Sequence, residues 1–159
     1  LGKDWLASLE RVADKEKQYK TARFIARYFF EKTFHTNEAT DFMIAFLEKS
    51  IFYAKANGID HKIKGAYYNA CFCIRTSGQK IKALQLLMSG KDYFLNEYQN
   101  PEDVYVGALK SCSNSLYYET DSIRNQAIKI LDNWKKTLNA SHEASLINFC
   151  NDYIRQLGR

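Results

Sequence analysis

The chain has 159 residues and a formal net charge of +5, with 23 basic and 18 acidic side chains interspersed along its length. This length suits a single domain with a real core, and the mixed charges disfavour a protein that binds nucleic acid directly. Because the apolar runs are too short for a membrane span and the N-terminus lacks a signal-peptide pattern, we expect a cytoplasmic protein with no membrane partner.

Seven glycines and one proline leave few residues that interrupt a helix, and no alternating strand pattern stands out, so we predict an all-α fold. Within a single domain over residues 1–159, the first predicted elements are a leader helix over residues 1–20 and a helical hairpin over residues 21–58. Thr36 and Asn37 are expected to cap the second helix of this hairpin.

Two further hairpins are predicted over residues 60–98 and 101–138. In the first of them, Gly78 permits a tight turn before a helix that returns over residues 81–96. In the second, the single proline of the chain marks the start of a helix that runs to about Tyr118.

A terminal helix over residues 141–158 is predicted to follow, with Ser141 as its cap. Its apolar residues Leu146, Phe149 and Tyr153 recur at helical spacing. We expect these side chains to pack inward against the last hairpin, because the end of a helical array needs a polar outer face.

Large and small residues recur at a fixed spacing in the second hairpin, namely Tyr67, Ala70, Cys71, Ile74, Gly78, Ala83, Leu87 and Gly90. This spacing resembles that of the tetratricopeptide repeat (TPR), in which small residues let two antiparallel helices approach closely. Related positions at Met43, Ala83 and Ala127 lie 40 and 44 residues apart, a little longer than the standard repeat of about 34 residues. The segment Phe46–Ile51 followed by Ala54–Gly58 resembles the second-helix ending of longer TPR units, as found in bacterial peptide-sensing regulators. The resemblance implies a right-handed α-α superhelix of about three TPR-like pairs plus a capping helix.

The same resemblance implies a binding face, because TPR proteins commonly bind peptides on their concave side and grip the peptide backbone with Asn amides. By repeat position Asn69 and Asn148 are equivalent, and cations on this face are expected to meet carboxylates. The predicted ligand-binding residues are Arg23, Arg27, Tyr68, Asn69, Phe72, Arg75, Lys110, Asn114, Tyr117, Asn148 and Asn151.

The sequence offers little that is typical of catalysis. The glycines are isolated and do not form a phosphate-binding loop, and His35, His61 and His142 lie far apart without a partner at metal-ligand spacing. The four cysteines fall in apolar stretches, which favours small buried side chains in a reducing compartment. We therefore expect no enzyme, no catalytic residue, no metal site and no cofactor.

These features predict a scaffold that binds a protein or peptide segment in the concave groove of a TPR superhelix. The alternative is a peptide- or effector-sensing domain of a larger regulator, such as a transcriptional one, which would contact nucleic acid only indirectly through an attached domain. A chain that does not begin with Met slightly favours this alternative. A homodimer formed through the end of the terminal helix is a further alternative.

Overall fold

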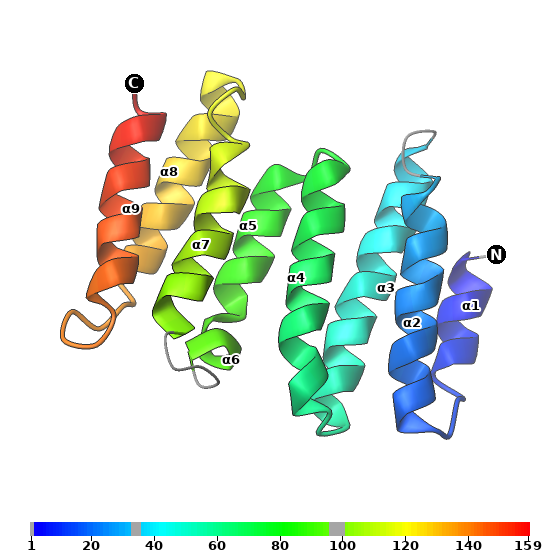
Figure 1. The fold of residues 1–159 in the computed structure, drawn as a ribbon. Coiled ribbons are helices and arrows are strands. Elements are labelled where there is room, and N and C mark those ends of the chain that lie inside the picture. Colours follow the sequence, from blue (N-terminus) through cyan, green and yellow to red (C-terminus); the bar gives the residue numbers. More distant parts are fainter. Residues whose placement is uncertain (1, 33–35, 96–100) are drawn as a thin grey trace. The chain divides into compact units, whose positions relative to one another are not determined.

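The computed structural model describes residues 2–32, 36–95 and 101–159, and the regular structure in these ranges is entirely α-helical (Figure 1). The helices are α1 (Gly2–Leu9), α2 (Lys15–Phe30), α3 (Asn37–Ala56), α4 (Asp60–Thr76), α5 (Lys80–Ser89), α6 (Lys91–Leu95), α7 (Pro101–Asn114), α8 (Asp121–Lys135) and α9 (Ala144–Leu157). The predicted all-α fold is confirmed for the described residues. In these ranges, each helix is too short or too polar to cross a lipid bilayer.

The chain divides into two compact units, one up to Gly78 and one from Gln79 onward. Unit 1 contains α1 to α4, and unit 2 contains α5 to α9. The boundary falls at the Gly78 turn, inside the hairpin predicted over residues 60–98. Its two helices, α4 and α5, therefore belong to different units, and their pairing stays a prediction.

Unit 1 is built around α3, which packs against both α2 and α4 (Figure 1). On α2, Ala22 and Ala26 are completely or almost completely buried, and their small side chains let the two helices approach closely. The Phe46 ring of α3 lies parallel to that of Phe29 of α2, with ring centroids 5.9 Å apart. Helix α1 packs on α2, where the Trp5 ring meets Tyr28 at 5.5 Å.

The ends of the helices in unit 1 follow from local chemistry. Oδ1 of Asp14 accepts a hydrogen bond from the Lys17 backbone N–H at 2.8 Å and so caps α2. Thr36 caps α3 in the same way, as predicted, through the Ala39 N–H at 3.0 Å. Gly58 has a φ of +62° and ends α3 in the left-handed region that favours glycine.

Unit 2 has α9 packed against both α7 and α8, and α5 packed against α7 and α8. Leu146, Phe149 and Tyr153 of α9 are buried, which confirms the packing expected of the terminal helix. Tyr105 of α7 is fully buried, its ring lies 4.9 Å from that of Phe94, and its hydroxyl donates a hydrogen bond to the Leu87 carbonyl at 2.7 Å.

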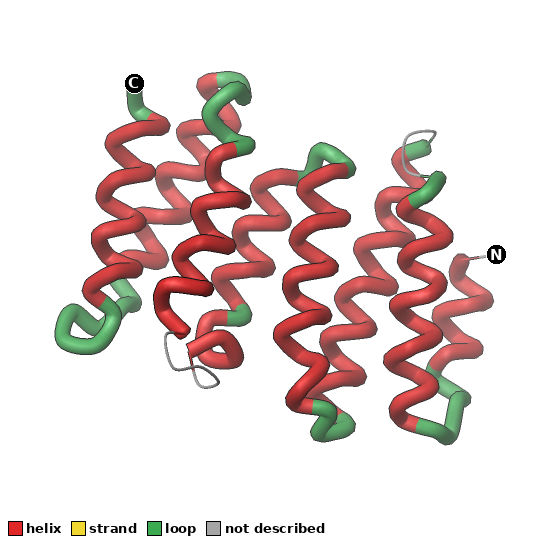
Figure 2. The backbone as a smooth tube through the Cα atoms, viewed as in Figure 1, coloured by secondary structure: helices red, strands yellow, loops and turns green. Residues whose placement is uncertain are grey.

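Several predicted boundaries differ from those of the structure, whose connecting loops Figure 2 shows. The leader helix ends at Leu9 and not at residue 20, because Asp14 starts a new helix. The helix predicted over residues 81–96 is interrupted at Gly90, between α5 and α6. Residue 96 lies outside the described ranges.

Two sequence-based predictions for unit 2 are wrong. Helix α7 ends at Asn114 rather than near Tyr118, and the residues that follow form turns. Ser141 does not cap the terminal helix, because Asn139 and Glu143 shape the turn before it. The Ser141 backbone N–H donates to Oδ1 of Asn139 at 2.9 Å, and α9 begins at Ala144 with Glu143 as its N-cap residue.

Candidate functional site: a basic groove in unit 1

A groove with a volume of about 410 Å³ runs between α2 and α4 of unit 1, and a residue of α3 lies at its base. We call it the basic groove. Its lining residues are Lys20, Arg23, Phe24, Arg27 and Phe30 of α2, Leu47 of α3, and Asn69, Phe72 and Cys73 of α4. The groove therefore combines three cationic side chains, one amide and several apolar groups.

Helical spacing explains why α2 supplies the cations. Lys20, Arg23 and Arg27 follow one another at intervals of three and four residues, so they lie on one face of the helix. A different face carries the buried Ala22 and Ala26, which pack toward α3. Burial of the alanine face fixes the rotation of α2 and turns the cations toward the groove.

The cations are held by weak contacts. Nη1 of Arg23 donates to the Tyr19 hydroxyl at 3.1 Å. The Arg27 Nε lies 3.7 Å from a Glu31 carboxylate oxygen, and Nζ of Lys20 lies 2.9 Å from one of Glu16.

Both ion pairs lie on exposed surface. Such pairs contribute little stability because water screens them. A ligand carboxylate can therefore compete for these side chains at low cost.

Helix α4 provides the other wall. Asn69 is half-buried, and its amide can both donate and accept a hydrogen bond. Phe72 is 54% exposed, which is unusual for a large apolar side chain, and the Arg75 guanidinium carbon lies 5.8 Å from its ring centroid. An exposed aromatic ring beside a cation offers a contact surface for an apolar ligand group.

The cysteine in the groove is not an activated nucleophile. Burial raises the pKa of the Cys73 thiol, and this effect exceeds the opposing influence of the nearby Arg23. A thiol with a raised pKa is protonated at neutral pH and reacts slowly. Cys73 therefore contributes a neutral, weakly polar surface to the groove.

The structure brings together four of the predicted site residues: Arg23, Arg27, Asn69 and Phe72. The prediction omitted the other residues of the groove, which are Lys20, Phe24, Phe30, Leu47 and Cys73. Helical spacing could have revealed Lys20, since it precedes Arg23 by three residues on the same face. Leu47 could not be found in this way, because it reaches the groove from α3, a different helix.

Two predicted residues of α4 lie beside the groove and not in its lining. Tyr68 is half-buried, and burial raises the pKa of its phenol. The Arg75 guanidinium contacts the Phe72 ring, which lines the groove.

The five remaining predicted residues belong to unit 2, where three of them contact neighbouring helices. Asn114 accepts a hydrogen bond from the Tyr153 hydroxyl, Tyr117 donates one to Gln156, and Asn151 accepts one from Lys135 at 3.2 Å. Lys110 and Asn148 are exposed. The basic groove is therefore defined by unit 1 alone.

Within the described part of the chain, no group of three or more His, Cys, Asp or Glu side chains is arranged to hold a metal ion. All four cysteines are buried thiols, as expected. Of the three histidines, His35 lies outside the described residues, and His142 is exposed.

Comparisons with protein-family models, with curated proteins and with solved structures gave no match for this chain.

Proposed function

We propose that this chain is a binding module that holds a protein or peptide segment in the basic groove. The observation that carries the proposal is the clustering of three cations, an amide and an exposed aromatic ring around one groove of about 410 Å³. Binding pockets typically measure about 300–1,000 Å³ and combine apolar walls with a few placed polar groups. The basic groove meets both conditions.

The lining indicates an acidic ligand segment. Guanidinium groups at Arg23 and Arg27 match the geometry of carboxylates, and each can donate two parallel hydrogen bonds. The Asn69 amide suits a peptide group of any sequence, because it pairs with both the N–H and the C=O. Phe72 would cover an apolar side chain that follows the acidic residues.

The finer description of the fold belongs to the same proposal. Helices α2 and α4 both pack against α3, and residues of all three line the basic groove. This arrangement supports our proposal that the helices form TPR-like pairs in a right-handed superhelix. The alternative function, an effector-sensing domain of a larger regulator, would use the same groove and stays a prediction.

The proposal can be tested by selecting binders from a random dodecapeptide library displayed on phage, with the full chain as bait. Affinities of the selected peptides are then measured by fluorescence anisotropy. We expect acidic peptides, and we expect the double variant Arg23→Glu/Arg27→Glu to bind them at least about tenfold more weakly, equivalent to about 1.4 kcal/mol.

The control variant is Lys129→Glu/Arg155→Glu, which reverses two exposed cations of unit 2 and changes the net charge by the same amount. It should keep the affinity within about twofold at physiological ionic strength, because screening limits long-range effects. Equal losses in the two variants would mean that overall charge and not the groove controls binding. That result would contradict the proposal.

A further inference from the structure

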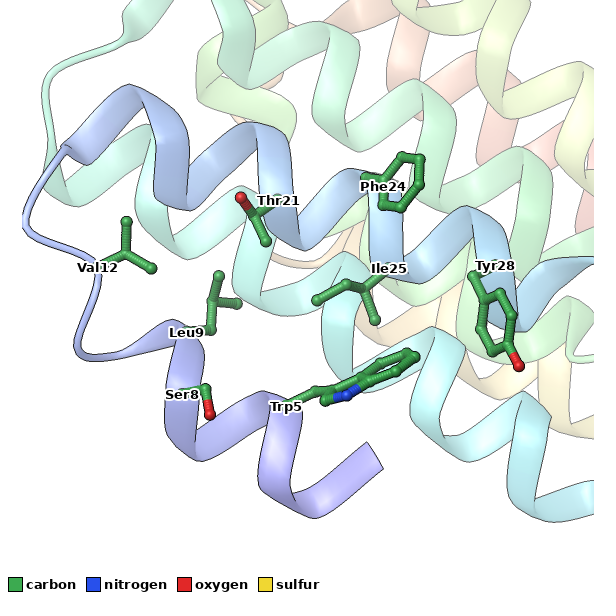
Figure 3. A pocket seen from close by; sticks show the side chains of 8 residues that line it. All are labelled: Trp5, Ser8, Leu9, Val12, Thr21, Phe24, Ile25 and Tyr28. Atoms are coloured by element: carbon green, nitrogen blue, oxygen red, sulfur yellow. The ribbon is translucent and has the colours of Figure 1, made fainter. Parts of the chain in front are cut away.

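A second groove, which we call the apolar groove, lies between α1 and α2 and has a volume of about 280 Å³. It is lined by Trp5, Ser8, Leu9, Val12, Thr21, Phe24, Ile25 and Tyr28. Figure 3 shows the Trp5 ring extending along the space between the two helices, with Ile25 and Tyr28 pointing toward α1. Ser8 and Thr21 carry the polar side chains of this lining.

The two grooves share one residue. Phe24 lines both of them and is 75% exposed, so it forms a ridge on α2 between the apolar and the basic groove. Thr21, Ile25 and Tyr28 lie on one side of this ridge, and Lys20, Arg23 and Arg27 lie on the other. A single helix thus presents an apolar surface and a cationic surface next to each other.

The size of the apolar groove favours a side-chain anchor over a whole small molecule. Its volume falls just below the range of about 300–1,000 Å³ that is typical of small-molecule sites. Aromatic and aliphatic side chains that fill such a pocket commonly dominate the energetics of an interface. The exposed Phe24 and Tyr28 would be covered by the remainder of the same ligand segment.

We propose that one acidic amphipathic segment of a partner protein occupies both grooves and crosses α2 at Phe24. Its apolar anchor fills the apolar groove, and its acidic side chains reach Lys20, Arg23 and Arg27. The acidic half of this inference rests on the proposed function, whereas the apolar half rests on the second groove.

The charges oppose a second copy of the chain as the occupant. A twofold contact through the ridge would place the same patch of each copy against the other. Lys20, Arg23 and Arg27 of one copy would then approach the same cations of its partner, which is unfavourable. An acidic segment has the complementary charge.

The test uses the full chain, the phage-displayed dodecapeptide library and two variants of α1. Ser8→Phe places a large side chain in the apolar groove and so plugs it. Ala7→Phe adds the same side chain to an exposed position of α1 that does not line the groove. Melting temperatures of both variants establish that each is folded.

The fluorescence of Trp5 can report on binding in the apolar groove. Trp5 lines it, and Trp134 is the second tryptophan of the chain, so a Trp134→Phe background leaves Trp5 as the only indole. Burial of an indole by a bound side chain shifts its emission to shorter wavelength. Analytical ultracentrifugation at the same concentrations follows the oligomeric state.

The proposal expects selected peptides to combine acidic residues with an apolar anchor. Ser8→Phe should weaken their binding at least tenfold, Ala7→Phe should leave it unchanged, and peptide should shift the Trp5 emission. Replacement of the anchor by Ser should abolish the emission shift.

Each of the following outcomes would overturn the inference. If acidic peptides bind through Arg23 and Arg27 while Ser8→Phe and the Trp5 emission show no effect, the proposed function stands and the two-groove segment is wrong. Both proposals fail if the selected peptides bind outside both grooves. They also fail if the wild-type chain enriches no peptide more than an Arg23→Glu/Arg27→Glu bait does. A dimer that Ser8→Phe converts to monomer would identify a second copy as the occupant.

Discussion

The two units differ in what their polar and aromatic side chains contact. In unit 1, the large apolar side chains of Phe24, Tyr28, Phe52 and Phe72 are exposed, and cations lie beside several of them. In unit 2, polar side chains join helices and turns of the unit to one another, as in the pairs Lys80–Glu119 and Lys91–Glu143. Unit 1 therefore presents exposed aromatic rings and cations that a ligand can contact. In unit 2, many polar side chains instead bind one another and stabilise the unit.

The contrast shows how similar residue types acquire different roles in one chain. Arg27 of unit 1 has an 81% exposed side chain and an exposed partner, so its charge can serve a ligand. The side chain of Lys91 in unit 2 is 21% exposed, and that of its partner Glu143 is 12% exposed. Water screens this ion pair less, so it stabilises the fold more. Burial of both partners, and not residue type, separates the two cases.

The largest expected effect concerns the core of unit 2. Tyr105→Ala should lower the free energy of unfolding by about 3–5 kcal/mol, because it removes a fully buried ring and the hydrogen bond to the Leu87 carbonyl. Urea denaturation followed by circular dichroism measures the change. Tyr118→Ala is the matched control, since Tyr118 is 95% exposed. Comparable losses in the two variants would contradict the described packing of α7.

A smaller effect is expected at Glu143. Burial alone would raise the pKa of this carboxyl, but hydrogen bonds from Lys91 Nζ and from the Asn139 backbone N–H bring it below its ordinary value. A carboxyl with a lowered folded-state pKa stabilises the fold at pH values above its unfolded-state pKa. This stabilisation is lost as the pH falls through the folded-state pKa.

Glu143→Ala should therefore cost about 2 kcal/mol at pH 7, because hydrogen bonds to charged groups contribute roughly 1.5–3 kcal/mol. The difference from wild type should shrink as the pH falls below the ordinary range of Glu. Melting curves from pH 7 to pH 3 test this. Asp152→Ala, at an exposed ion pair of the same unit, should show little change, and a pH-independent Glu143→Ala difference would refute the assignment.

The smallest effect concerns unit 1. Asp14→Ala should destabilise the chain by about 1 kcal/mol, because it removes the side-chain acceptor of the Lys17 N–H at the start of α2. Asp14→Asn should keep most of this stability, since Asn is an equally good N-cap. Since α2 lines both grooves, hydrogen exchange in its first turn should report the difference. Identical exchange in the two variants would show that the cap is unimportant.

Local features of the sequence predicted much of the helical structure. Thr36 and the single proline mark the starts of α3 and α7, and the apolar spacing in α9 predicted its buried face. The predicted leader helix is too long because it runs through Asp14, which caps the following helix. The Gly90 interruption was missed because small residues also occur where helices pack closely.

The candidate site was harder to predict, because a groove depends on which helices become neighbours. Arg23 and Arg27 could be assigned to one helix face from their spacing, and Asn69 and Phe72 to another. Phe24 was not selected, because an apolar residue on a predicted helix is normally expected in the core. The apolar groove was not predicted either, since it requires α1 to end at Leu9 and to pack along α2.

The most direct test of the central claim is hydrogen exchange measured by mass spectrometry on the full chain, with and without a saturating acidic peptide from the selection. The account predicts that protection on binding increases in α2 and α4, whose residues line the basic groove. It also predicts that Arg23→Glu/Arg27→Glu abolishes this increase. Protection confined to residues 101–159, with α2 and α4 unchanged, would contradict the assignment of the binding site to unit 1.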